Sequence, residues 1–205
     1  MQRRSIPPHA SALGGRQERS GYARGVRPRQ QPVWLELVQL VPIISLAFPF
    51  IVAGKIDLAR AGSGLLVAAL LTLPVSGLVL FAKGILNPIL VGTGLWLWVS
   101  AVAFLLPAAS LVAWLSEAQG AGLFLGVVAV GISTTFLSPQ GFIGARHPDA
   151  RWLRRSSWTL LALAFVALGA SWFFRHDIRA GGGLPFILLN VARRALVLRA
   201  PPTPE

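Results

Sequence analysis

The residue types best suited to metal, haem or nucleophilic chemistry are scarce in this chain of 205 residues. Its three histidines, His9, His147 and His176, all lie outside the long apolar runs, so they are poorly placed to ligate a haem buried among membrane helices. The sequence contains no cysteine, which excludes disulfides, thiolate metal sites, iron–sulfur clusters and a cysteine nucleophile. We therefore expect no metal site and no cofactor.

Sequence motifs for catalysis are equally incomplete. The string from Gly131 to Ser133 begins like a GxSxG nucleophile elbow, but Thr135 stands where the second glycine should be. His147 and Asp149 form a candidate acid–base pair, although one histidine near one aspartate in a basic loop is usually solvated. No GxxxxGK[ST] phosphate loop occurs. The sequence favours a protein without catalytic residues; an enzyme acting on a lipid or polyprenyl carrier, with a site at residues 146–155, is a weaker alternative.

The elements that must position any site are long apolar runs. Leu95–Leu115 holds 21 residues without a charge, and a helix of that length reaches about 30 Å, the thickness of a bilayer's hydrocarbon core. Trp96 and Trp114 near its ends are typical of membrane boundaries. The chain is 54% hydrophobic and 13% charged, against about 25% charged in soluble domains. These features predict an all-α, polytopic membrane protein.

The hydropathy pattern divides the chain into three parts. We expect a disordered basic tail over 1–31, a five-span bundle within 32–174, and a basic segment over 175–205 with a short amphipathic interfacial helix at 184–199. Residues 84–94, broken by Asn87 and Pro88, are either a re-entrant turn or a connector. The expected transmembrane helices cover residues 33–53, 65–82, 95–115, 120–138 and 157–174.

A few residues within these runs are candidate polar or packing positions. Glu36 and Gln39 are three apart and share a helix face, and Asn87 is the polar residue of the broken segment. Glu36 is the one charged residue in an expected span and lies near its end, which argues against a proton relay. Gly122 and Gly126 are in GxxxG register, which favours close helix contact either within the chain or between copies.

The net charge of +12 indicates an anionic partner surface. Because arginines flank the apolar runs, we expect anionic lipid head groups rather than nucleic acid. With the 1–31 tail counted, the distribution of Lys and Arg favours a cytoplasmic N-terminus and, with five spans, a C-terminus outside, most simply in a bacterial inner membrane. Without the tail, the loops alone favour the opposite orientation. The candidate contacts with lipid or a partner protein are Arg151, Arg154, Arg155, Arg193 and Arg194.

Two functions fit these observations. The first is a non-catalytic integral membrane protein that serves as an accessory, assembly or scaffold subunit, with other membrane subunits or a second copy as its partner. The alternative is a small transporter or channel for an uncharged or weakly polar solute, with Glu36, Gln39 and Asn87 along its path.

Overall fold

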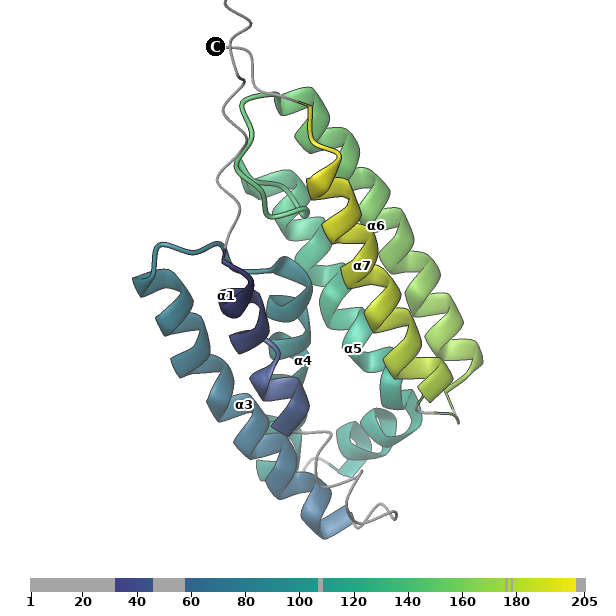
Figure 1. The fold of residues 1–205 in the computed structure, drawn as a ribbon. Helices are drawn as coiled ribbons and strands as arrows, with labels where there is room; N and C mark the ends of the chain where they lie inside the picture. Colours follow the sequence, from purple (N-terminus) through teal and green to yellow (C-terminus); the bar gives the residue numbers. More distant parts are fainter. Residues whose placement is uncertain (1–31, 46–57, 107–108, 176, 178, 202–205) are drawn as a thin grey trace, which may run out of the picture.

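The structure is a computed structural model that describes residues 32–45, 58–106, 109–175, 177 and 179–201. Within these ranges every regular element is a helix, which confirms the all-α class (Figure 1). The predicted tail over 1–31 lies outside the described residues. Among the described residues, five helical segments are long and apolar enough to cross a membrane, which fits a multi-pass membrane protein: Gly62–Phe81, Pro88–Leu105, Gly120–Leu137, Ala150–Phe173 and Ala180–Leu198.

Five long helices pass back and forth along the bundle (Figure 1). Helix α4 packs between α3 and α5, while α6 packs between α5 and α7. A short π-helical turn, η1 (Arg179–Gly183), leads into α7, and a short helix, α1 (Val33–Val38), precedes the long ones. The long helices are α3 (Leu58–Phe81), α4 (Pro88–Leu105), α5 (Ala109–Leu137), α6 (Ala150–Phe173) and α7 (Leu184–Leu198).

The prediction of a single helix over 95–115 is wrong, because two helices share this stretch. Helix α4 ends at Leu105, and Leu106 is extended with φ −88° and ψ 139°. The following residue in the sequence is a proline, which disfavours helical geometry in the residue before it. Helix α4 instead begins earlier, at Pro88. Most of the segment 84–94 is thus regular helix, with a short connector before it, and is not a re-entrant turn.

The C-terminal helix forms where it was expected, over Leu184–Leu198, but its packing differs from the prediction. The sequence predicts an interfacial helix over 184–199, but α7 packs against α6 and η1 as a member of the bundle. Its Leu189 is buried, and Ala180–Leu198 is the fifth candidate span. The predicted first span, 33–53, is described only as far as residue 45, with a shorter apolar helix over Trp34–Ser45.

The last expected span also changes, because α6 starts at Ala150 and not at residue 157. Arg151, Arg154 and Arg155 therefore lie on the first two turns of this helix and not in a loop. Asp149 allows this early start because its carboxylate caps the free backbone N–H groups of the first turn.

The tightest packing in the bundle joins α4 to α5. A Cβ added to Gly92 would lie 2.5 Å from Val127 Cα, and one added to Gly126 would collide with the Gly92 carbonyl oxygen. Trp96 lies over Gly122, where it is buried against α5. Small residues thus let two backbones touch, as is typical of membrane helix pairs.

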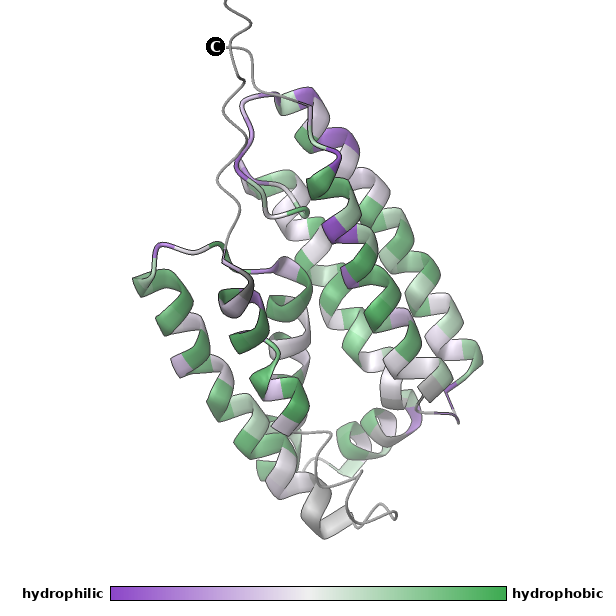
Figure 2. Cartoon of the chain, in the orientation of Figure 1, coloured by the Kyte–Doolittle hydropathy of each residue, from purple (hydrophilic) through white to green (hydrophobic). Residues whose placement is uncertain are grey.

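The outer faces of the helices are strongly apolar (Figure 2). Phe81, Leu137 and Phe173 are 89%, 84% and 79% exposed, and many other large aliphatic side chains point outward. Exposed apolar surface on this scale is unfavourable in water and favourable in lipid. Inside the bundle, Phe124 and Val127 of α5 pack with Leu160 of α6 in the main core.

Candidate functional site

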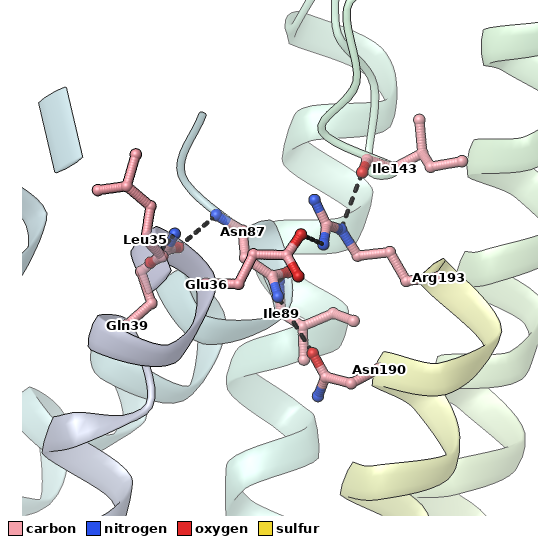
Figure 3. A network of polar contacts seen from close by, with 8 residues as sticks. All are labelled: Leu35, Glu36, Gln39, Asn87, Ile89, Ile143, Asn190 and Arg193. Carbon is pink, nitrogen blue, oxygen red and sulfur yellow. Dashed lines mark hydrogen bonds and ion pairs between the residues drawn. The ribbon is translucent and has the colours of Figure 1, made fainter. Parts of the chain in front are cut away.

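Polar side chains from α1, α4 and α7 meet near one end of the bundle (Figure 3). Gln39 follows α1, Asn87 precedes α4, and Asn190 and Arg193 lie on α7. Gln39, Asn87 and Arg193 are only 5%, 6% and 7% exposed. Because buried polar groups are costly unless they are hydrogen-bonded, the partners of each side chain decide what this cluster can do.

Asn87 is the centre of the cluster. Its side-chain Oδ1 accepts a hydrogen bond from the backbone N–H of Ile89 at 3.1 Å, which is an N-cap interaction. Pro88 at the first helical position has no N–H to satisfy and fixes a helical φ. The local sequence Asn-Pro therefore starts α4 and leaves the Asn87 Nδ2 and backbone N–H groups free to bond with other segments.

Those two donors join three helical segments into one chain of hydrogen bonds. The Asn87 backbone N–H donates to Gln39 Oε1 at 2.8 Å, and Asn87 Nδ2 donates to Asn190 Oδ1 at 3.1 Å. At the two ends, Gln39 Nε2 donates to the Leu35 carbonyl at 3.1 Å, and Asn190 Nδ2 donates to the Phe186 carbonyl at 3.0 Å. Each amide oxygen accepts and each amide nitrogen donates, so all three amides are bonded within the protein.

Arg193 is less completely satisfied. Its Nε donates to the Ile143 carbonyl oxygen at 3.0 Å, and its Nη1 lies 3.9 Å from Glu36 Oε1. The second distance is too long for a hydrogen bond, so the Glu36 carboxylate balances the positive charge of Arg193 without a direct hydrogen bond to its guanidinium. The Arg193 side chain is 9% exposed and that of Glu36 is 37% exposed. Among the described residues, Arg193 is the one charged residue that is buried.

The loop between α5 and α6 brings the Ile143 carbonyl to Arg193. Phe142 and Ile143 are fully buried, and Ile143 N–H points to Ser157 Oγ at 3.4 Å. Two glycines make this path feasible, since Gly141 and Gly144 have φ of +60° and +58°. The loop thus folds inward over the start of α4 and supplies a carbonyl acceptor that the sequence pattern did not indicate.

The same end of the bundle is tied to the residues after α7. Asp149 accepts hydrogen bonds from the N–H groups of Arg151 at 2.8 Å and Trp152 at 3.1 Å. These bonds, first that from Trp152, lower the pKa of Asp149 against an opposing effect of desolvation. His147 Nδ1 accepts from Asp149 N–H at 3.1 Å, so Nε2 carries the proton that is donated to the Pro201 carbonyl at 2.9 Å.

The candidate positions from the sequence are thus divided into three groups. Glu36, Gln39 and Asn87 lie in one cluster, joined by Arg193. Gly122 and Gly126 face α4 of the same chain, which is one of the two alternatives for their spacing. The exposed arginines Arg151, Arg154, Arg155 and Arg194 remain available for contact with lipid or a partner, whereas Arg193 is turned inward.

Two members of the cluster, Asn190 and the Ile143 carbonyl, are not among the candidate positions predicted from the sequence. Asn190 carried a signal, because it lies three residues before Arg193 and so shares its helix face. The partners of this face were not evident, since Asn87 is 103 residues away and Ile143 is 50 residues away.

Comparison with protein-family models, curated proteins and solved structures finds no match to this chain. In the described part of the chain, no group of three or more His, Asp or Glu side chains is placed to hold a metal ion. The features of the chain that bear on its function are the hydrogen-bond cluster, the exposed arginines and the apolar outer faces.

Proposed function

We propose that this protein is an integral membrane accessory subunit that assembles with, or scaffolds, other membrane subunits. The observation that carries the proposal is the bonded state of Gln39, Asn87 and Asn190. These amides lock α1, α4 and α7 together and are bonded to each other rather than presented to a solute. Together with the backbone contact of α4 and α5, these bonds hold the helices to one another inside the bundle.

The polar contact surface in this proposal is one end of the bundle, which we call the basic end. Figure 2 shows hydrophilic segments at this end, near the α5–α6 loop and the start of α6. Exposed cations here suit acidic partner segments or anionic head groups. Its exposed cationic residues are Lys83, Arg146, Arg151, Arg154, Arg155, Arg194 and Arg199.

We further propose that the basic end faces the cytoplasm, in a bacterial inner membrane. Positive residues are enriched on the cytoplasmic side of membrane proteins. The described chain begins at Pro32 at this end, next to a sequence segment with seven more arginines, and α7 returns to it (Figure 1). Both sequence ends of the bundle then share one side, whereas five spans with an interfacial last helix would separate them.

The test is purification of the tagged protein from its native membrane in mild detergent, with mass spectrometry of bound proteins. Stoichiometric recovery of one or more other membrane subunits is the expected result. A triple variant, Arg151→Gln, Arg154→Gln and Arg155→Gln, should lose a partner that docks on the basic end, while Arg175→Gln near the opposite end should keep it. Recovery of the protein alone, or of a homo-oligomer that conducts a solute in vesicles, would refute the accessory function.

A small transporter or channel is the second candidate, and one contact favours it. Glu36 and Arg193 form a partly exposed charged pair between α1 and α7, close to Asn87. Ionisable residues within membrane segments often mark a solute path. In this case Glu36→Gln should change the flux of a weakly polar solute in reconstituted vesicles, at unchanged expression and folding.

A further inference from the structure

Arg193 has more hydrogen-bond donors than the described structure uses. Its guanidinium carries five N–H donors in a planar fork, and the described residues supply one hydrogen-bond acceptor, the Ile143 carbonyl at Nε. The Nη1 group faces the Glu36 carboxylate at 3.9 Å, beyond hydrogen-bond distance. No other acceptor for the Nη groups comes from the described residues. An arginine whose side chain is 9% exposed and makes so few hydrogen bonds is suited to bind an anion.

The position of Arg193 determines which anions can reach it. It lies five residues before Leu198, the end of α7, or about 7.5 Å along the helix axis. It therefore sits just below the basic end, at the depth where the polar head groups of a bilayer meet the hydrocarbon core. Arg194, the next residue, is exposed and adds positive potential at the same level. Basic sites between helices at this depth suit lipid head groups.

Glu36 faces the Nη1 group of the Arg193 guanidinium. This side chain is 37% exposed, so its carboxylate can turn to water and leave the Nη edge open. An incoming phosphate would then replace a distant carboxylate with two direct charge-assisted hydrogen bonds, in the bidentate geometry that arginine favours. Gln39, Asn87 and Asn190 need not move, because their hydrogen bonds do not involve Arg193.

We infer that Arg193 binds a phosphate group at the basic end, in competition with Glu36. The phosphate belongs either to an anionic phospholipid or to a free phosphate ion that enters from the aqueous side. This site does not depend on the accessory function proposed above, since a transporter would have it equally. Neither Arg194 nor the arginines of α6 can substitute for it, because they are exposed and lack the enclosed geometry.

The experiment uses the full chain in detergent and native mass spectrometry to count bound lipid. The probes are dioleoyl phosphatidylglycerol and dioleoylglycerol, which share acyl chains and differ in the phosphoglycerol head group. We expect retention of the first lipid and not the second. Arg193→Gln should lower that retention by about tenfold, the scale of losing a charge-assisted hydrogen bond, while Arg194→Gln should lower it less than about threefold.

Glu36→Gln keeps the test valid if Arg193→Gln fails to fold. Removing the competing carboxylate should raise phosphatidylglycerol retention several-fold. Added inorganic phosphate distinguishes the two sources: displacement of the lipid at low millimolar concentration supports a free phosphate ligand, and its absence supports the head group. Equal binding of both lipids, or equal retention by the wild-type protein and the Arg193→Gln and Glu36→Gln variants, would overturn the inference.

Discussion

The contact between α4 and α5 makes Gly92→Ala the sharpest test of the packing. The new Cβ would lie 2.5 Å from Val127 Cα, 2.7 Å from Gly126 O and 2.8 Å from Val127 N. All three are backbone atoms, so no side-chain rotation relieves the clash. Ordinary contact starts at 3.4 Å, and the two helices must therefore separate locally by about 0.9 Å.

That separation determines the expected loss of stability. Overpacking by one methyl group in a tight interface costs about 1–3 kcal/mol of unfolding free energy. For a chain of this size, each kcal/mol lowers the melting temperature by about 2–4 °C, so we expect a drop of about 2–12 °C. Separation of the helices would also weaken neighbouring contacts, including that of Trp96 with Gly122, and so lower the stability further.

The assay is the fraction of monodisperse protein that survives heating in mild detergent, measured by size-exclusion chromatography. Gly169→Ala is the matched control, because Gly169 is also helical and its added Cβ would have nothing within 4 Å. We expect the control to be as stable as the wild type or more stable by up to about 1 kcal/mol, because alanine is favoured over glycine inside a helix. Equal melting temperatures for Gly92→Ala and Gly169→Ala would refute the close backbone contact.

Three further predictions follow from individual contacts. Asn87→Ala removes the cap of α4 and the bond to Asn190, and should cost about 1–2 kcal/mol by denaturant titration, with Asn87→Asp recovering the cap alone. Thr72 accepts a bond from Trp98 Nε1 at 2.9 Å between α3 and α4, so a double-mutant cycle of Thr72→Val and Trp98→Phe should give a coupling of about 0.6 kcal/mol. The folded-state pKa of Asp149 is lowered, so its stabilising effect is present above the usual carboxyl pKa of about 3.9 and is lost as pH falls through the folded-state value. The Asp149→Asn variant should therefore show a smaller loss of thermal survival in acid than the wild type. An unchanged pH profile would contradict this.

The membrane class of the fold was predictable from the sequence, because length and lack of charge suffice for it. Runs near 20 residues without Asp, Glu, Lys or Arg identify membrane-spanning helices without knowledge of their packing. The helix boundaries were harder to predict from the sequence. Helix α3 continues through Pro74, whereas α4 ends at Leu105, close to another proline in the sequence. The sequence around the two prolines does not show which of them ends a helix.

Helix α7 carries two adjacent arginines whose surroundings the sequence does not distinguish. Arg193 and Arg194 in a short apolar run resemble an interfacial helix, whose charged face meets water. In the structure the two arginines differ in burial, because Arg194 is exposed and Arg193 is covered by the Ile143 carbonyl and Glu36. Only the tertiary fold brings that carbonyl and that carboxylate close to Arg193, and no local pattern in the sequence encodes it.

The candidate cluster was half predictable. Glu36, Gln39 and Asn87 were recognisable as polar residues in apolar surroundings, which is a sound signal for membrane helices. That they belong to one cluster depends on the chain returning through α7, since Asn190 links to Asn87 across 103 residues.

The most direct test of the account asks whether α7 crosses the membrane and returns the chain to the basic end. The sequence has no cysteine, so each introduced cysteine is the sole thiol and can be labelled with a membrane-impermeant maleimide in inverted and right-side-out vesicles. We predict that Lys83→Cys, Ala150→Cys and Arg199→Cys are labelled from the cytoplasmic side and Asp177→Cys from the opposite side. Labelling of Asp177→Cys and Arg199→Cys from the same side would contradict a crossing α7, and with it the gathering of the arginines on one face.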